Sequence, residues 1–396
     1  MKKLFTLVAS LALMAMGHSA LAQGNMINGQ VNSPNYISTG MPIALIAPDA
    51  LAAAMGDAGV ASTPDAYSAH WNNAKFAFAE NQFGISTTYT PWLRNLHVSD
   101  MNLLYLGGYY RINKRSAVAG SITYFSLGEI QSTDDQGNQG QMINPNEFMM
   151  DATYSMKLSD NLSLGATARY LRSDLTNGMS VNDGSGYVQT KAANSLATDV
   201  GLYFQQDLDA GQQFALGAFV SNLGAKFRYS DDDTETEFLP ANLRVGGRYS
   251  YAVDNYNRLN FLMDFNKLLV PTPPVTIDGE TYGSYDNLTD YHQTGVMQGA
   301  LMSFYDAPGG LKEELQEVQI SAGAEYWYND MIAARAGYFY EHANKGGRQY
   351  ATLGFGFNYS RIQVDFAYLI PTARFSNNPL SNTIRISLTL NMGKVK

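Results

Sequence analysis

The feature that most constrains this chain is a period of two in its apolar side chains. In the stretch NTIRISLTLNM, residues 382–392, polar and apolar side chains alternate without interruption from Thr383 onward. A β-strand points successive side chains to opposite faces, so Ile384 and Ile386 share an apolar face while Thr383 and Arg385 share a polar one. A strand of this kind must place its apolar face against a protein core or against lipid.

Fourteen segments repeat this pattern, and most are close to the roughly 9–11 residues that a tilted strand needs to cross a bilayer. They are residues 83–90, 101–111, 117–126, 147–157, 162–172, 195–205, 214–223, 242–251, 258–267, 318–328, 331–341, 350–360, 361–370 and 382–392. In the segment RIQVDFAYLI we expect Ile362, Val364 and Phe366 to face lipid and Gln363 and Asp365 to face a lumen. The count is even, as a closed antiparallel barrel with both ends on one side requires.

The connections between these segments alternate between short and long. The short ones include LSDN, YND and the turn at Ser360–Arg361, and the long ones are 127–146, 173–194, 224–241 and 268–317. Outer-membrane barrels have short periplasmic turns and longer external loops, whereas a soluble β-protein has no reason to sort its loops this way. The sequence therefore predicts an all-β membrane protein: a 14-stranded antiparallel outer-membrane β-barrel over 83–392, with periplasmic termini and extracellular long loops.

The amino-terminal residues have the composition of a secretory signal peptide. Lys2 and Lys3 precede an apolar run, and the small residues before Gln23 form an A-x-A site, so we expect cleavage between Ala22 and Gln23 and a signal peptide over 1–22. Removing the two lysines leaves 24 Lys+Arg against 35 Asp+Glu, a formal charge of −11. The acidic balance argues against nucleic acid as a partner. The chain has no cysteine, so disulfides and thiolate chemistry are excluded.

The stretch PDALAAAMGDAGVASTPDAYSAHWNNAKFAF, residues 48–78, departs from the strand pattern. Pro48-Asp49 is a plausible helix start, glycines end that helix, and Thr63-Pro64-Asp65 predicts a second start. We expect residues 23–82 to form an amino-terminal segment with a small helical plug in the barrel lumen. A periplasmic tail that never enters the barrel is the alternative. The residues expected to shape the plug are Asp49, Met55, Gly56, Asp57, Gly59, Trp71 and Asn72.

The same stretch resembles the amino-terminal signature of the PorV/PorQ family, outer-membrane proteins of the type IX secretion system. DAPGGLKEELQE (306–317), residues 320–357 and DFAYLIP (365–371) resemble the PorV subfamily in particular. The resemblance implies a FadL-like barrel with an amino-terminal plug. Two departures stand out: the Asn-Pro-Ala common in related transporters is replaced by Asn72-Asn73-Ala74, and the last strand lacks a terminal aromatic residue.

The resemblance also implies a role in protein transport. Members of the PorV subfamily bind the carboxy-terminal sorting domain of secreted clients as these leave the translocon. They deliver the clients to an attachment complex that contains a sortase-like protease, for joining to surface lipopolysaccharide. The partners expected from the resemblance are therefore client proteins, the translocon, the attachment complex and outer-membrane lipids. The alternative is a FadL-like transporter of hydrophobic small molecules, with a lateral opening at a strand kink near Gly107-Gly108 or Gly246-Gly247.

The large loop 268–317 is the candidate partner-binding region, because loops near this length are unusual without a function. Aromatic, methionine and aliphatic side chains in it suit a protein interface. The alternative is a lid over the barrel mouth, in which the same side chains pack on other loops. The candidate partner-binding residues are Leu268, Leu269, Val270, Tyr282, Tyr285, Met297, Leu301, Met302, Phe304 and Tyr305.

Catalytic chemistry has little support in the sequence. His292, Ser303 and Asp306 share the large loop and could serve an outer-membrane lipid deacylase, the third functional hypothesis. No G-x-S-x-G or H-E-x-x-H pattern is present. We expect no enzymatic activity, no metal and no cofactor.

Overall fold

The computed structural model describes residues 35–92, 100–133, 139–182, 187–231, 236–277, 280–372 and 383–394. By its internal contacts the chain divides into Met1–Pro34 and Asn35–Lys396, and only the second unit falls within the described residues. The predicted signal peptide, with Ala22 and Gln23, therefore lies outside them. In the described parts of the chain, no helix is long and apolar enough to cross a membrane.

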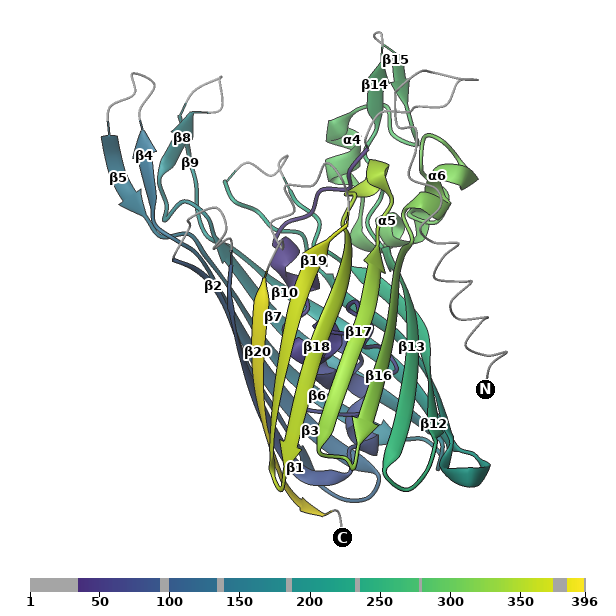
Figure 1. The fold of residues 1–396 in the computed structure, drawn as a ribbon. Helices are drawn as coiled ribbons and strands as arrows, with labels where there is room; N and C mark the ends of the chain where they lie inside the picture. The colour runs from purple at the N-terminus through teal and green to yellow at the C-terminus, as the bar shows by residue number, and fades with distance from the viewer. Residues whose placement is uncertain are drawn as a thin grey trace. The chain divides into compact units, whose positions relative to one another are not determined.

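Fourteen strands form a closed antiparallel barrel, and β1 closes it by pairing with β20 (Figure 1). The strands follow one another around the barrel in chain order. They are β1 (Asn81–Pro91), β2 (Met101–Arg111), β3 (Ser116–Leu127), β6 (Asn146–Lys157), β7 (Leu162–Asp174), β10 (Ala193–Asp207), β11 (Gln213–Gly224), β12 (Asn242–Ala252), β13 (Asn257–Leu268), β16 (Gln319–Tyr328), β17 (Ile332–Tyr340), β18 (Gln349–Tyr359), β19 (Ile362–Pro371) and β20 (Ile384–Lys394). Each corresponds to one predicted segment, so the predicted fold class is confirmed.

The two faces of the strands differ as the alternation predicts. In β20, Ile384 is 50% exposed on the outer face, whereas Arg385 is only 2% exposed on the inner face. In β19, Ile362 and Phe366 are exposed while Asp365 is buried. Because apolar side chains cover the outside and polar ones line the inside, the barrel has the pattern of a membrane-spanning sheet.

The connections sort to two ends of the barrel. We call the end with long connections the loop end and the opposite end the turn end. Three two-stranded hairpins and several short helices lie at the loop end (Figure 1). The hairpins were not predicted from the sequence. These elements are β4 (Ile130–Thr133), β5 (Gln139–Ile143), β8 (Ser180–Asn182), β9 (Tyr187–Gln189), β14 (Val275–Ile277), β15 (Glu280–Tyr282), α4 (Leu288–Gln293), α5 (Val296–Met302), α6 (Leu311–Gln316) and η5 (Ala343–Lys345). The turn between β10 and β11 contains η4 (Asp209–Gly211).

Residues 41–79, which we call the inner segment, run along the inner face of the barrel wall. Its helices pack against β2, β3, β6, β7 and β10 on one side and β18, β19 and β20 on the other (Figure 1). They are η1 (Pro42–Leu45), α2 (Ala50–Ala53), α3 (Ser68–Trp71) and η2 (Asn73–Phe78). The expected helical segment is thus present between the amino end of the described chain and the first strand.

The helix boundaries in the inner segment agree only in part with the prediction. Asp49 caps α2 as expected, because its carboxylate accepts a hydrogen bond from the amide of Ala52. Gly56 ends this region with a φ of +67°, a conformation that glycine adopts without strain. The second helix begins at Ser68 rather than beside Asp65, because the Asp65 carboxylate instead holds a turn by accepting from the Tyr67 amide.

The inner segment enters from the loop end. The Asn35 amide donates to the carbonyl of Asn344, and the Gly40 amide donates to the carbonyl of Phe238; both acceptors lie in connections at the loop end. From there the chain passes through the barrel and reaches β1 at the turn end. The described chain begins, at Asn35, beside the connections of the loop end, and it ends, at Lys394 of β20, at the turn end. The residues before Asn35 lie outside the described chain, so the expected periplasmic amino terminus stays a prediction.

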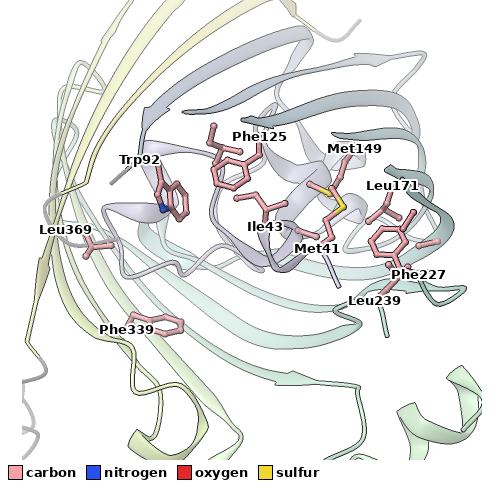
Figure 2. Packing of buried hydrophobic residues seen from close by; sticks show 14 of the residues in the cluster. Met41, Ile43, Trp92, Phe125, Met149, Leu171, Phe227, Leu239, Phe339 and Leu369 are labelled. Atoms are coloured by element: carbon pink, nitrogen blue, oxygen red, sulfur yellow. The ribbon is translucent and has the colours of Figure 1, made fainter. Parts of the chain in front are cut away.

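An apolar layer surrounds the start of the inner segment near the loop end. Met41 and Ile43 pack among side chains from the loop-end portions of the strands and from the connection that follows β11. Figure 2 shows Met41 and Ile43 between Phe125, Met149 and Leu239. The segment is therefore held at this level by packing on several sides.

Candidate functional site

The barrel wall binds the backbone of the inner segment through polar side chains. The Asp264 carboxylate accepts from the amides of Gly59 and Val60 at 2.7 and 2.8 Å. On the opposite wall the Ser155 hydroxyl accepts from the amide of Ala77 and donates to the carbonyl of Ala74. These bonds satisfy amides and carbonyls that lack a partner in short helices.

Inward-facing glycines let the inner segment approach the wall closely. A Cβ at Gly337 would lie 2.1 Å from the backbone carbon of Met55, and one at Gly165 would lie 2.5 Å from the amide nitrogen of Ala74. Distances this short are not tolerated, so only glycine fits at these wall positions. This gives Met55 a clear role: its backbone rests directly on two glycines, Gly323 and Gly337.

Asn72 and Asn73 attach the inner segment to β7 and β10. The Asn72 amide group donates to the carbonyls of Val60 and Leu202, and that of Asn73 donates to the hydroxyl of Thr167 and the carbonyl of Asp199. A proline at position 73 could make neither of the latter bonds. The departure from Asn-Pro-Ala therefore adds anchoring contacts to the wall.

The remaining predicted plug residues also form contacts inside the barrel. The Trp71 indole donates to the carboxylate of Asp49 at 2.6 Å, and the Arg244 guanidinium lies 4.7 Å from the Trp71 ring centroid. The Tyr350 hydroxyl donates to Asp57 at 2.5 Å. The structure thus brings all seven predicted residues into the lumen, where they bind one another or the wall.

Two buried charge clusters in the lumen were not identified from the sequence. Arg169 lies 2.7 Å from the carboxylate of Asp151 and 3.0 Å from that of Asp199. On the other side of the barrel, Arg335 pairs with Glu325 and with an aspartate of β19. The only signal in the sequence is that each of these residues faces inward in its own strand; strand register decides which of them meet.

The large loop between β13 and β16 has its own apolar core. Val270, Tyr285 and Tyr291 are buried together with Phe238, which comes from the connection after β11. Leu269 is buried in a second cluster with residues of that connection and of α5. Three of the candidate partner-binding residues, Leu269, Val270 and Tyr285, are therefore not available to a partner, because they pack against the neighbouring loop as the lid alternative requires.

Other predicted residues of the loop are exposed. The large apolar side chains that stand out between 297 and 315 define what we call the α5–α6 surface. Met297, Leu301, Phe304 and Tyr305 are candidates from the sequence, whereas Leu311 and Leu315 were not predicted. Leu301 is 64% exposed and Leu311 75%, values unusual for leucine in a well-packed region. Of the other candidates, Tyr282 is exposed, and Leu268 and Met302 are half-buried.

A buried ionic cluster, which we call the clasp, fastens α6 to the barrel. Lys267 of β13 lies 3.0 Å from Glu314 and 2.5 Å from Glu317. Lys345 of η5 lies 2.5 Å from Glu313 and 2.9 Å from Glu317. Because all three glutamates come from the stretch DAPGGLKEELQE, that stretch links α6 to two separate parts of the barrel rim.

Asp306, at the start of this stretch, is buried beside the clasp. Its carboxylate accepts from the amide of Thr272 at 3.1 Å, and its other oxygen has no partner. Burial, with added repulsion from Glu314 and Glu317, raises the pKa of Asp306 to about 7. Asp306 is therefore partly protonated near neutral pH.

The deacylase hypothesis finds no catalytic geometry. The Ser303 hydroxyl donates to the carbonyl of Ala300, and His292 Nδ1 is hydrogen-bonded to the carbonyl of Thr236. Asp306 binds the amide of Thr272, so each of the three residues has its partner elsewhere. In the described parts of the chain, no group of three or more His, Cys, Asp or Glu side chains is placed to hold a metal ion.

The β-ladders are in register at both proposed kink sites. β2 pairs continuously with β1 and β3 through Gly107 and Gly108, and β12 pairs continuously with β11 and β13 through Gly246 and Gly247. A register shift lies instead in β10, between Thr198 and Val200 against β11. The strand kink expected for a lateral opening is therefore not seen at either glycine pair.

Solved structures of a transporter and a channel have a similar fold. The toluene transporter TodX of Pseudomonas putida superposes with a TM-score of 0.51 at 12% identity, covering 90% of this chain and 98% of that one. The TodX deltaS2S3 mutant monoaromatic hydrocarbon channel gives 0.50 at 13% identity, with coverage of 88% and 99%. A FadL homologue of Pseudomonas aeruginosa gives 0.45 at 12% identity, with coverage of 91% and 100%. At this identity the likeness shows the fold alone.

Sequence comparison supplies the family. No curated protein sequence matches the chain. A family model described as type IX secretion system protein PorV matches residues 28–275, which is more than half of the chain. This agrees with the resemblance noted in the sequence and with the barrel architecture. The chain therefore belongs to the PorV family of type IX secretion system proteins, and it is an outer-membrane β-barrel whose loop end faces the cell exterior.

Proposed function

We propose that this component of the type IX secretion system binds the carboxy-terminal sorting domain of secreted clients on its α5–α6 surface. It then carries the clients from the translocon to the cell-surface attachment complex. The single observation that carries this proposal is the set of exposed apolar side chains on the large external loop, Leu301 and Leu311 foremost. Membership of the PorV family supports a role in type IX secretion, and the exposed side chains of the loop support the choice of the α5–α6 surface as the binding site.

The α5–α6 surface has the physical properties of an interface. Protein interfaces are enriched in Met, Phe and Tyr, and exposed apolar residues of this size are otherwise unfavourable in water. The surface is also held in place: the clasp and the buried core around Val270 and Tyr285 fix α5 and α6 before a partner arrives. A preorganised surface loses less conformational entropy on binding, which favours affinity.

The transporter hypothesis gains no specific support. The likeness to TodX concerns the fold, and unrelated functions share folds. The inner segment is fastened to the wall by Asp264, Asn72 and Asn73, and the glycine pairs expected to open the wall pair continuously with their neighbours. We therefore retain the client-carrier function alone.

The experiment compares two sets of substitutions in the full-length protein, expressed in its own outer membrane with an affinity tag. The test variant is Met297→Ser, Leu301→Ser and Phe304→Ser. The control variant is Ile130→Ser and Met142→Ser, which removes exposed apolar side chains from the β4–β5 hairpin. Each protein is extracted in mild detergent, and co-purifying proteins are identified by mass spectrometry.

The proposal predicts that the unaltered protein and the control retain clients with a common carboxy-terminal β-domain, together with a sortase-like protease. The test variant should lose the clients and stop secretion while keeping the heat-dependent gel mobility of a folded barrel. Clients retained at the level of the control would overturn the proposal. Recovery of bound lipids without protein partners would favour the transporter. Cells that carry His292→Ala should secrete clients normally, because the described contacts of His292 include no catalytic partner.

A further inference from the structure

The large external loop covers part of the outer face of the barrel wall. In β13, Asp264 faces the lumen and Phe265 faces outward, where it is exposed. Because side chains alternate along a strand, Lys267 is the next outward residue toward the loop end, yet it is only 8% exposed. Its ammonium lies against the carboxylates of Glu314 and Glu317. The clasp therefore places α6 over the outside of β13.

The helix α5 covers the neighbouring strand at the same level. In β12, Val245 is exposed on the outer face, whereas the next outward residue, Leu243, packs half-buried against a cluster that includes Ala300 of α5. Across the ladder between the two strands, Val245 pairs with Phe265. Leu243 pairs with Lys267. Both helices thus begin to cover the wall one outward position beyond an exposed apolar pair.

Exposed side chains of the loop continue this apolar face. The centroid of the Phe304 ring lies 5.9 Å from the ammonium nitrogen of Lys267. Met297 and Leu301 stand on one side of α5 because they are four residues apart, and Phe304 follows three residues later in the turn after the helix. All three side chains are large, apolar and exposed. The outward apolar series of β13 is therefore extended beyond Lys267 by side chains of the loop.

The height of the wall agrees with a position of these helices at the level of lipid. An outer-membrane barrel presents an apolar band about 25 Å tall. From Val253, directly after β12, to Val245, the strand advances about 27 Å, which is about 20 Å along the membrane normal at the usual strand tilt. The last part of the band, about 5 Å, therefore falls at the level of Leu243 and Lys267. That level is the one that α5 and α6 cover.

We propose that Met297, Leu301 and Phe304 contact the outer leaflet of the membrane. Their continuity with the lipid-facing side of β12 and β13 favours lipid as the occupant over a soluble partner. Helices that rest at the boundary between headgroups and acyl chains bury their apolar side there, which removes that side from water. The lipid contact goes beyond the proposed function and does not depend on it. That a client displaces lipid from this surface rests on the proposed function.

The chain has no cysteine, so a single introduced cysteine can carry a fluorescent label at one defined position. The test variants are Leu301→Cys and Met297→Cys, each labelled with the dye NBD. Phe265→Cys is the reference for lipid contact, and Met142→Cys, at an exposed position of the β4–β5 hairpin, is the reference for water. The full-length proteins, free of clients, are placed in nanodiscs of dioleoylphosphatidylcholine with or without a nitroxide-labelled phosphatidylcholine.

We expect the nitroxide lipid to quench the labels at Leu301 and Met297 to the extent seen at Phe265, and dissolved iodide to quench them little. The label at Met142 should show the reverse. Quenching by iodide to the extent seen at Met142, without quenching by the lipid, would overturn the inference. Shielding from both quenchers would also overturn it, because protein rather than lipid would then cover the surface. Heat-dependent gel mobility checks that each labelled barrel is folded.

The failure of this inference can be told apart from the failure of the proposed function, because the labels are read without clients. If the label at Leu301 stays in water while the variant with Met297, Leu301 and Phe304 replaced by serine loses its clients, the proposed function stands and the inference is wrong. If the label is quenched by lipid while the serine variant keeps its clients, the lipid contact stands and the proposed function fails.

Discussion

The side-chain amide of Asn35 donates to Oε1 of Glu313 at 3.3 Å, which joins the start of the described chain to α6 across 278 positions of sequence. Asn35 also donates to the carbonyl of Pro273, and Ile37 packs on the apolar core of the large loop beside Met302. Residues 35–41 therefore form a strap between the inner segment and the loop that carries the α5–α6 surface. The path of the inner segment into the barrel and the position of the large loop are therefore coupled through this strap.

Loosening the strap should loosen the large loop. Replacing Asn35 and Ile37 by alanine removes two side-chain hydrogen bonds and buried apolar contacts, each worth about 1 kcal/mol. We expect limited proteolysis within 269–318 to become at least about tenfold faster, while the heat-dependent gel mobility of the barrel stays unchanged. Tyr36→Ala is the matched control, since Tyr36 is exposed. Equal cleavage rates in all three proteins would show that the strap does not hold the loop.

Asp306 should make the stability of the large loop depend on pH. Its pKa is about 7 in the folded loop against an ordinary value of 3.8. Between these values the folded loop retains a proton that an opened loop releases, so the free energy of opening falls as pH rises through this window. Protease protection of the loop should therefore be greater at pH 5 than at pH 8.

Asp306→Asn should remove this dependence, because asparagine resembles the protonated acid and still accepts from Thr272. We expect the variant to be protected equally at pH 5 and pH 8, and better than the unaltered protein at pH 8. Asp286→Asn, at an exposed position of the same loop, should leave the pH dependence as it was. Persistence of the full pH effect in Asp306→Asn would assign it to another group.

Two adjacent glycines of β12 allow a matched test of the contact between the wall and the inner segment. A Cβ at Gly246 faces inward, 2.3 Å from a carboxylate oxygen of Asp264, 2.4 Å from the carbonyl oxygen of Met263 and 2.8 Å from Val60. A Cβ at Gly247 faces outward and meets only Leu216 and a carbonyl oxygen at 3.2–3.3 Å. Gly246→Ala should lower the free energy of unfolding by about 1–3 kcal/mol, the usual range for overpacking.

Gly247→Ala should change stability much less, because its nearest neighbour is the end of a flexible side chain. Urea unfolding in lipid vesicles, followed by tryptophan fluorescence, measures both variants on the same scale. Since the two positions share a strand and a level in the barrel, a difference between them measures the crowding on the inner face, where β13 and Val60 of the inner segment both approach. Equal destabilisation would mean that β12 itself, rather than the inner segment, is sensitive to alanine.

The cluster around Arg169 should be strongly interdependent. Arg169→Met leaves the buried carboxylates of Asp151 and Asp199 without their cation, and removal of one partner from a buried ion pair costs about 3–5 kcal/mol. Adding Asp151→Asn and Asp199→Asn removes the unpaired charges and should restore a large part of the loss. Urea unfolding in lipid vesicles measures the free energy of unfolding of the single and the triple variant. Additive destabilisation in the triple variant would contradict charge pairing as the reason for the cluster.

The sequence alone determined the strands, because the signal that defines them is local. Alternation such as that of 384–392 depends only on the period of an extended chain and on a lipid phase outside, so all fourteen strands could be predicted with the face that each presents. Asp49 and Gly56 likewise mark one helix through their own backbone and side-chain chemistry. Family membership was also readable at this level, since it follows from contiguous stretches of sequence.

Tertiary packing determines which residues far apart in the sequence come into contact. Arg169 contacts Asp199 and Asn35 contacts Glu313 because barrel closure and strand register set the positions of these residues. Nothing in the local sequence of either residue of a pair points to the other. The division of the large loop into buried Val270 and exposed Leu301 has the same origin. Both are apolar residues in one loop, and burial depends on whether a neighbouring loop folds over them. The local sequence does not indicate which loop will lie beside these residues, because that is set by tertiary packing.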